Sequence, residues 1–152
     1  MACGQSGRER FFMSRRQARE AALQTLFQLE LNPPPESDAE EAWQTQALDA
    51  AVEESPVEGR RDYSYAASLV RGTRGNLAAI DEAIAAAAHD WKLERMTGVD
   101  RNIVRIAVYE MKYGAKKVDV GVAINEAVEL AKKFGTDDSS RYVNGILGAL
   151  AR

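Results

Sequence analysis

Two helix-length repeats of apolar residues, separated by a short polar corner, occupy the last thirty residues of the chain, Val122 to Ala151. The i, i+3, i+4, i+7 spacing that places side chains on one helix face occurs at Ile124, Ala127, Val128 and Ala131 and again at Val143, Ile146, Leu147 and Leu150. We expect Gly135 to end the first helix with a positive φ and Asp137 or Asp138 to cap the second. The sequence therefore predicts two amphipathic helices that meet at an exposed corner.

The helical period continues through most of the chain. Ser14 and Gln17 form a capping-box pattern at the start of a helix that stops at Asn32, before three prolines. Further helices are predicted from Trp43 to near Pro56 and Gly59, from Asp62 to Ala87 with weak points at Gly72 and Gly75, and from a cap at Asp100 to a stop at Gly114. No stretch alternates with the period of a strand, so the sequence predicts an all-α fold.

Length and composition limit the class of protein. A chain of 152 residues, of which 45% are hydrophobic, can form one domain with a sizeable core. We expect this domain to span residues 14–152, after a disordered extension of residues 1–13. The chain has no apolar run of about eighteen residues and no secretion signal at its start. This pattern predicts a cytoplasmic protein that has no membrane partner.

Residue types that serve catalysis or metal binding are scarce. Cys3 is the only cysteine and His89 the only histidine, so the chain offers neither a disulfide nor a histidine-based triad or metal cluster. We expect His89 to be a surface or capping residue. No glycine-rich phosphate loop with its lysine is present. The sequence therefore predicts a protein that is not an enzyme, with no catalytic residue, metal or cofactor.

Charge is distributed unevenly along the chain. The net charge is −3, but residues 36–58 carry eight acidic residues and no Lys or Arg. Residues 1–35 hold five arginines against three acidic residues, and residues 59–152 hold fifteen basic residues against twelve acidic ones. A partner that meets only these flanking parts would meet positive charge, and the local field decides such encounters. The net charge therefore does not exclude a nucleic acid.

Three arginines crowd the predicted start of the first helix. Arg15 and Arg16 follow Ser14 directly, and Arg19 lies one turn further on, although the partial positive charge of a helix start favours acidic residues there. This placement is explained if phosphates approach the helix start, where guanidinium groups and backbone donors act together. A solvated helix face, with Arg16 paired to Glu20, is the alternative explanation.

The corner between the last two helices combines the residue types that single-stranded RNA requires. Rings can stack on unpaired bases, cations can neutralise phosphates, and a carboxylate can accept from a base amino group. The candidates are Lys132, Lys133, Phe134, Asp138, Arg141 and Tyr142. Two of these candidates have a structural alternative: Phe134 can be part of the core, and Asp138 can be a simple cap. We expect Tyr142 to be partly exposed, because it lies beside the apolar stripe.

Several segments resemble the NusB family of bacterial antitermination factors. The carboxyl-terminal run from Ala123 to Gly135, followed by Asp138-Ser139 and by the segment from Tyr142 to Leu147, resembles the signature of that family. The segment from Ser14 to Gln24 is similar to its arginine-rich first helix, and Val99–Glu110 is similar to its central helix. The chain departs from the family at Gly121, near which many members have a proline.

The resemblance implies a fold of about seven helices in two small packed bundles, residues 14–89 and 90–152. It also implies a function, the binding of boxA RNA together with the ribosomal protein NusE. This binding would occur in a complex that helps RNA polymerase to resist termination on ribosomal RNA operons. The positions that match the family's NusE surface are Phe27, Asp100 and Arg101.

Two other functions and the oligomeric state stay open at this point. A similar pattern occurs in the RNA-docking domain of ribosomal RNA cytosine methyltransferases, although this chain ends at Arg152 without a cofactor-binding domain. A helical protein-interaction module without an RNA role is the second alternative. The sequence also does not decide between a monomer and a homodimer.

Overall fold

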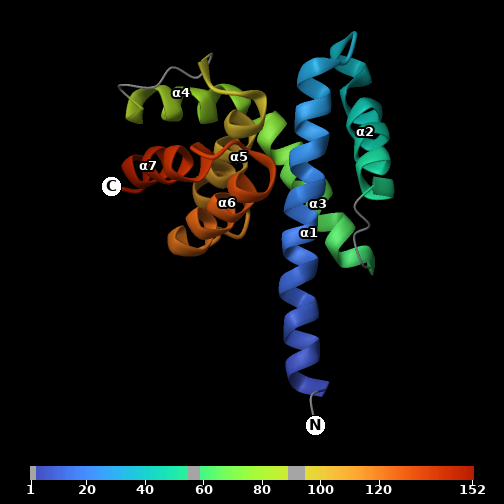
Figure 1. Ribbon diagram of the computed structural model, residues 1–152. Helices are drawn as coiled ribbons and strands as arrows, with labels where there is room; N and C mark the ends of the chain where they lie inside the picture. The colour runs from blue at the N-terminus through green and yellow to red at the C-terminus, as the bar shows by residue number, and fades with distance from the viewer. Residues whose placement is uncertain (1–2, 55–58, 89–94) are drawn as a thin grey trace. The chain divides into compact units, whose positions relative to one another are not determined.

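The computed structural model (Figure 1) is all-α, as predicted, with seven α-helices among the residues that it describes. It describes residues 3–54, 59–88 and 95–152, and no strand occurs among them. His89, the end of the second predicted helix near Pro56 and the acidic Glu58 lie outside these ranges. The helices are α1 (Cys3–Leu31), α2 (Glu40–Glu54), α3 (Gly59–Gly75), α4 (Leu77–Ala87), α5 (Gly98–Val108), α6 (Val120–Phe134) and α7 (Ser139–Ala151), with a 3-10 turn η1 (Ser37–Ala39) and a π-helix η3 (Tyr109–Tyr113).

The chain divides into two compact units, Met1–Val70 and Arg71–Arg152, and the division falls inside α3. The predicted boundary between two bundles, at residues 89 and 90, lies further along the chain. That boundary and the domain limit at residue 14 remain predictions. Each unit is described below by itself.

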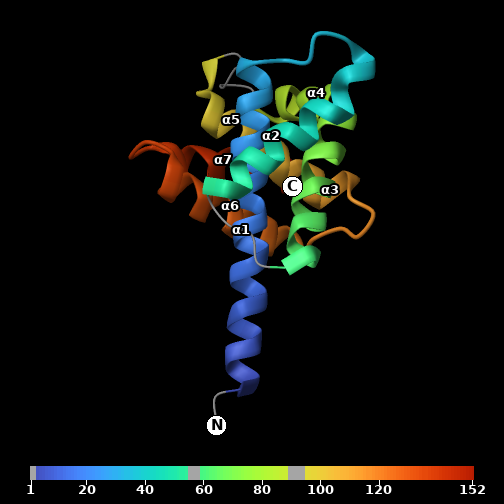
Figure 2. The same cartoon turned by 90° about the vertical axis from the view of Figure 1, so that its right-hand side faces the viewer.

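In the first unit, α2 packs against the carboxyl-terminal half of α1, as both views show (Figures 1 and 2). The core between the helices is made mainly of small side chains, Ala18, Ala21 and Ala66, with the larger Leu48. Small residues allow helix backbones to approach closely, so little apolar volume is needed to close the core. The indole nitrogen of Trp43 donates to the backbone oxygen of Asn32 at 2.9 Å, which fixes the start of α2 on the end of α1.

The first helix begins at Cys3, so the predicted start at Ser14 is wrong. Because the helix continues through residues 3–14, Ser14 does not cap it, and the three arginines lie in its interior. Backbone N–H groups in a helix interior bond to the preceding turn and are not available to a ligand. Phosphates therefore cannot meet free backbone donors beside these arginines, and only the arginine side chains can contact RNA.

The single helix predicted over residues 62–87 is two helices. It breaks at Asn76, between Gly75, the last residue of α3, and Leu77, the first residue of α4. Both the backbone and the side-chain nitrogen of Asn76 donate to the backbone oxygen of Gly72, at 3.0 and 2.7 Å. A side chain that bonds to the local backbone competes with the helix ladder, and Gly75 adds a weak helix position. The predicted weak point at Gly75 is therefore the break.

The second unit is built around α5, which packs against α4, α6 and α7. Its most buried large side chains are Ile80, Ile84, Ile103, Val104, Ile106, Val108, Val143, Ile146 and Leu147. The π-helix η3 continues α5 and ends before Gly114, the predicted stop. A Cβ atom at Gly72 would collide with the ring of Tyr109, so this glycine is required for the close approach of that ring.

The predicted cap of α5, Asp100, is wrong, and α6 has a cap that no sequence pattern predicted. Thr97 is the cap of α5, because its hydroxyl accepts from the backbone nitrogen of Asp100 at 3.1 Å. Asp100 lies in the first turn instead. Asp119 caps α6 and accepts from the backbone nitrogens of Gly121 and Val122. The Gly121 N–H is therefore in use, and a proline at that position could not make this bond.

A hydrogen bond between α2 and α3 gives a pH-dependent prediction. The hydroxyl of Tyr63 donates to Asp49 Oδ1 at 2.7 Å. This bond, followed by burial and the charge of Asp49, raises the pKa of Tyr63 from 10.0 to about 12. Because the fold favours the neutral phenol, the stabilisation is complete below pH 10 and is lost as the pH rises to about 12. We expect Tyr63→Phe to lower the free energy of unfolding at pH 7 by about 0.5 kcal/mol, since the bond is exposed.

Chemical denaturation of both proteins at several pH values measures this difference, which should shrink between pH 10 and 12. Tyr113→Phe, at an exposed tyrosine of the second unit, is the control and should show no such trend. A difference that stayed constant up to pH 12 would contradict the assigned pKa.

Candidate nucleic-acid interface

The corner between α6 and α7 is closed by Gly135 and Ser139. Gly135 has φ −92°, so the predicted positive φ is wrong. The position still requires glycine, because an added Cβ would lie 2.5 Å from Ser139 Cβ and 2.7 Å from the backbone oxygen of Ala131. Ser139 is buried, and its hydroxyl accepts from the backbone nitrogen of Thr136 at 2.9 Å. The corner is thus a tight turn held by a serine that sequence reasoning missed.

Asp138 occupies the cap position of α7 but makes no capping hydrogen bond with its side chain. Its carboxylate pairs with Arg141 instead, at 2.8 Å, and the two side chains are 81% and 84% exposed. The prediction that an aspartate at 137 or 138 caps the helix through its side chain is therefore wrong for Asp138. An ion pair this exposed contributes little to stability, so both groups can exchange their contact for one with a ligand.

Both aromatic side chains of the corner, Phe134 and Tyr142, are half-buried. For Tyr142 this confirms the predicted partial exposure. Burial, and after it the charge of Asp100, raises the pKa of Tyr142, so the ring is neutral at physiological pH. Such a ring, fixed on one side and accessible on the other, can stack on an unpaired base.

The predicted lysines lie in the last turn of α6 and are exposed. Lys132 Nζ lies 3.5 Å from Glu129 Oε1, and this ion pair joins residues about one turn apart on α6. Lys133 Nζ lies 5.4 Å from the centre of the Phe134 ring. The helix dipole favours cations at the carboxyl-terminal end of a helix, and this effect is a structural reason for both lysines. With Arg141 they provide the positive charge of this corner.

Asp100, predicted as a contact for the protein partner, is buried with 6% exposure. Its Oδ1 atom has no hydrogen-bond partner among the residues that the structure describes. Asp100 is on α5, which packs against α7, the helix that carries Tyr142, and the charge of Asp100 contributes to the raised pKa of Tyr142. The structure therefore brings a predicted protein-contact residue close to a predicted RNA-contact residue within the second unit.

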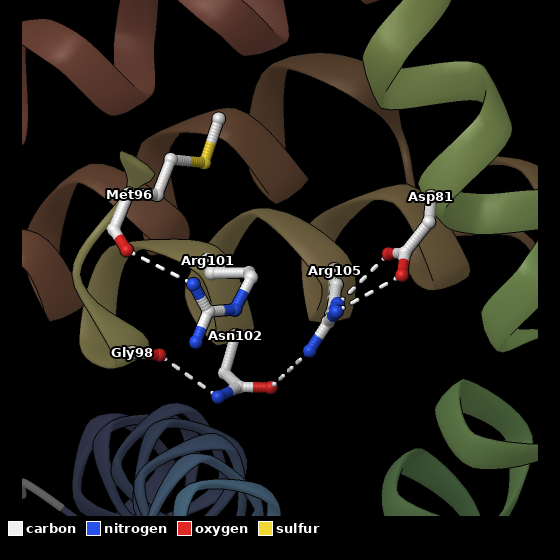
Figure 3. A network of polar contacts seen from close by, with 6 residues as sticks. All are labelled: Asp81, Met96, Gly98, Arg101, Asn102 and Arg105. Carbon is white, nitrogen blue, oxygen red and sulfur yellow. Dashed lines mark hydrogen bonds and ion pairs between the residues drawn. The ribbon is translucent and has the colours of Figure 1, made fainter. Parts of the chain in front are cut away.

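A network of polar side chains fixes the start of α5 (Figure 3). Arg105 makes two bonds with the carboxylate of Asp81 on α4, at 2.8 and 2.9 Å, and a third with the Asn102 side chain at 3.2 Å. Asn102 in turn donates to the backbone oxygen of Gly98 at 2.8 Å. Bidentate pairs of this kind impose geometry as well as energy. The network holds the helix turn that carries Asp100.

Arg101, the third predicted partner contact, is half-buried. Its guanidinium donates to the backbone oxygen of Met96 at 2.9 Å. Burial, and after it the charge of Arg105, lowers the pKa of Arg101. The side chain is therefore held beside the segment that precedes α5, and only part of it can reach a partner.

The arginines of α1 differ in exposure. Arg15 is stacked on Tyr65 of α3, with 3.8 Å between its Cζ atom and the ring centre, and Arg19 lies 5.8 Å from the same ring. Arg19 is buried with 5% exposure, whereas Arg16 is exposed. A stacked guanidinium keeps donors at its edge for phosphates. Sequence reasoning missed Tyr65, which no local pattern links to α1.

Phe27, predicted as a further contact for the protein partner, is half-buried on α1 and lines a groove beside α2. It lies in the first unit, whereas Asp100 and Arg101 lie in the second. At the start of α5 the Thr97 hydroxyl accepts from the Asp100 backbone nitrogen, and a threonine three residues before Asp100 is the sequence signal for this cap.

Comparison with known proteins gives the family directly. The model of the NusB family matches residues 16–152. The chain belongs to the NusB family. The transcription antitermination protein NusB of Bdellovibrio bacteriovorus is 45% identical over 139 residues, which is 91% of this chain and 96% of that protein. The protein of the same name from Pelotomaculum thermopropionicum is 44% identical, over 91% of this chain and 89% of its own length.

Solved structures of the family confirm the fold. T. maritima NusB is 34% identical, with a TM-score of 0.75 and a match over 90% of this chain and 89% of that one. A crystal structure of the antitermination factors NusB and NusE in complex with double-stranded RNA contains a chain that is 25% identical, with a TM-score of 0.73 over 91% and 96% of the two chains. The predicted family is confirmed, and the relatives' names agree with the prediction of a protein that is not an enzyme. None of the described helices has the length and apolar composition needed to cross a bilayer.

Proposed function

We propose that this chain is a transcription antitermination factor that binds boxA RNA together with NusE and supports RNA polymerase on ribosomal RNA operons. The observation that carries the proposal is the match over nine-tenths of the chain to a structure of NusB and NusE in complex with RNA. Relatives that align over almost their whole length are named transcription antitermination proteins, which favours this function over an RNA-docking domain of a methyltransferase. A factor with this function acts during transcription, so we also propose a cytoplasmic location.

The corner of α6 and α7 is the proposed site for RNA bases. It offers two half-buried rings, an exposed carboxylate and three exposed cations, Lys132, Lys133 and Arg141. Stacking with a hydrogen bond to a base edge suits single-stranded RNA, because a paired base presents neither its face nor its Watson–Crick edge. Asp138 would accept from a base amino group while the cations neutralise adjacent phosphates.

The protein partner would contact Phe27, Asp100 and Arg101. The Oδ1 atom of Asp100 is buried, so the carboxylate would attract a cationic group of NusE through its charge. Since Asp100 lies near Tyr142, a partner bound there would also stabilise the ring that stacks on RNA. Cooperative binding of RNA and NusE follows from this arrangement.

A substitution at Arg16 tests whether α1 contacts RNA. We expect Arg16→Gln to weaken RNA binding and to make the dependence of the binding constant on salt shallower, because one phosphate contact is lost. The slope of log K against log salt should fall by about 0.7 for single-stranded RNA. Fluorescence polarisation of a labelled boxA RNA at several salt concentrations measures both quantities.

Arg71→Gln, which changes an exposed arginine outside the predicted contacts, is the control. Replacing Arg15 or Arg19 is a poorer test, since their packing on Tyr65 would change the fold as well. An Arg16→Gln protein with the parent's salt slope would remove α1 from the RNA surface.

A further inference from the structure

A groove of about 510 Å3 lies between α1 and α2 of the first unit. Its apolar lining includes two large rings, Phe27 on α1 and Trp43 on α2, and the small side chains of Ala47 and Ala50. The groove is open to solvent, since Gln28, Ala50 and other residues of its lining are exposed. Its volume lies within the range of sites that accept a ligand or a bulky side chain.

The groove is prepared for an apolar contact in two ways. The indole N–H of Trp43 already donates to Asn32, so covering the ring would leave no unpaired donor. The small side chains on α2 leave the space that an incoming side chain would fill. Aromatic anchors in such a space supply most of the binding energy of protein interfaces.

The charge around the groove selects the class of partner. Every charged residue from Glu36 to Glu54 is acidic, and Glu54 itself lines the groove. A surface of this charge repels the phosphates of RNA and attracts a basic segment of a protein. The groove is thus electrostatically opposite to the proposed RNA surfaces.

We propose that the groove between α1 and α2 docks a basic amphipathic segment of a protein, which inserts an apolar side chain between Phe27 and Trp43 and places Lys or Arg against Glu54 and the other acidic residues of α2. Short amphipathic helices commonly bind grooves between two helices in this way. The inference rests on the proposed function only in that Phe27 is a proposed contact of the protein partner. It extends that single residue to a defined surface and a defined chemistry.

The test uses the full chain and a labelled helical peptide of about 18 residues that carries Leu and Phe on one face and Lys on the other. A peptide of the same composition with its apolar residues distributed around the helix is the control ligand. We expect the patterned peptide to bind about tenfold more tightly than the control peptide, because only the patterned one can fill the groove.

Ala50→Arg places a long cation in the mouth of the groove, at an exposed helix position that tolerates it. It should weaken binding of the patterned peptide by about tenfold. Thr45→Arg is the control, because it introduces the same cation at an exposed position of α2 outside the groove lining. It should weaken binding of the patterned peptide less than about threefold. Equal effects of the two variants, or equal binding of the two peptides, would overturn the proposal.

The same variants tested with boxA RNA separate this proposal from the proposed function. Ala50→Arg should weaken RNA binding no more than Thr45→Arg does. Loss of RNA binding by Ala50→Arg alone would show that the groove takes RNA and would also overturn the proposal. Absence of boxA binding by the parent chain would contradict the proposed function and leave the peptide result intact.

Discussion

Gly135→Ala is expected to lower the free energy of unfolding by about 1–3 kcal/mol, the usual cost of inserting a methyl group where no space exists. The added Cβ would lie 2.5 Å from Ser139 Cβ and 2.7 Å from the oxygen of Ala131. Neither neighbour can move easily, because one is backbone and the other is the base of a buried side chain. The backbone between α6 and α7 must therefore move, and this movement should weaken the hydrogen bond from the Thr136 backbone nitrogen to the Ser139 hydroxyl.

Gly148→Ala is the matched control, since a Cβ at this position in α7 meets no atom within 4 Å. Alanine is a better helix former than glycine, so this variant should be more stable than the parent by up to about 1 kcal/mol. Thermal unfolding and RNA affinity, measured for both variants, should show that only Gly135→Ala loses stability and RNA binding. Equal stability of the two variants would contradict the corner geometry.

Tyr142→Ala is expected to lose about 1–3 kcal/mol of RNA binding, which is the range for one base stacked on an aromatic side chain. Because the ring is half-buried, its removal should shift the melting temperature less than emptying a core site does. Tyr142→Phe keeps the ring and should retain most of the affinity. Melting temperature and RNA affinity of both variants distinguish stacking from a structural role.

Asp138→Asn checks the same corner through a different interaction. The amide adds donors to a group that was only an acceptor, so the preference among RNA sequences should change. The lost ion pair with Arg141 is exposed and should alter stability little. A large melting shift for Tyr142→Ala, together with unchanged selectivity for Asp138→Asn, would remove the corner from the RNA site.

Hydrophobic periodicity predicted most of the fold. The last two helices, the stop at Gly114 and the weak point at Gly75 all lie where the pattern placed them. The start of α1 was wrong because residues 3–14 have no apolar stripe, and a helix without a stripe leaves no periodic signal. Helix propensity alone is a weak guide to such a segment.

The side-chain contacts of the site were harder to predict. Arg105 and Asp81 are separated by 24 residues, and no local pattern relates them. The stacking of Arg15 on Tyr65 likewise depends on how two helices pack. Gly135 was correctly singled out, but for the wrong reason, since the space beside Ser139 and not the backbone angle excludes a side chain.

The most direct test of RNA recognition with a protein partner is a titration of the purified chain against labelled boxA RNA and a scrambled RNA, with and without NusE, at moderate salt. We predict tighter binding of boxA than of the scrambled RNA, and a larger difference in the presence of NusE. Equal affinity for the two RNAs with NusE present would contradict boxA recognition by this protein.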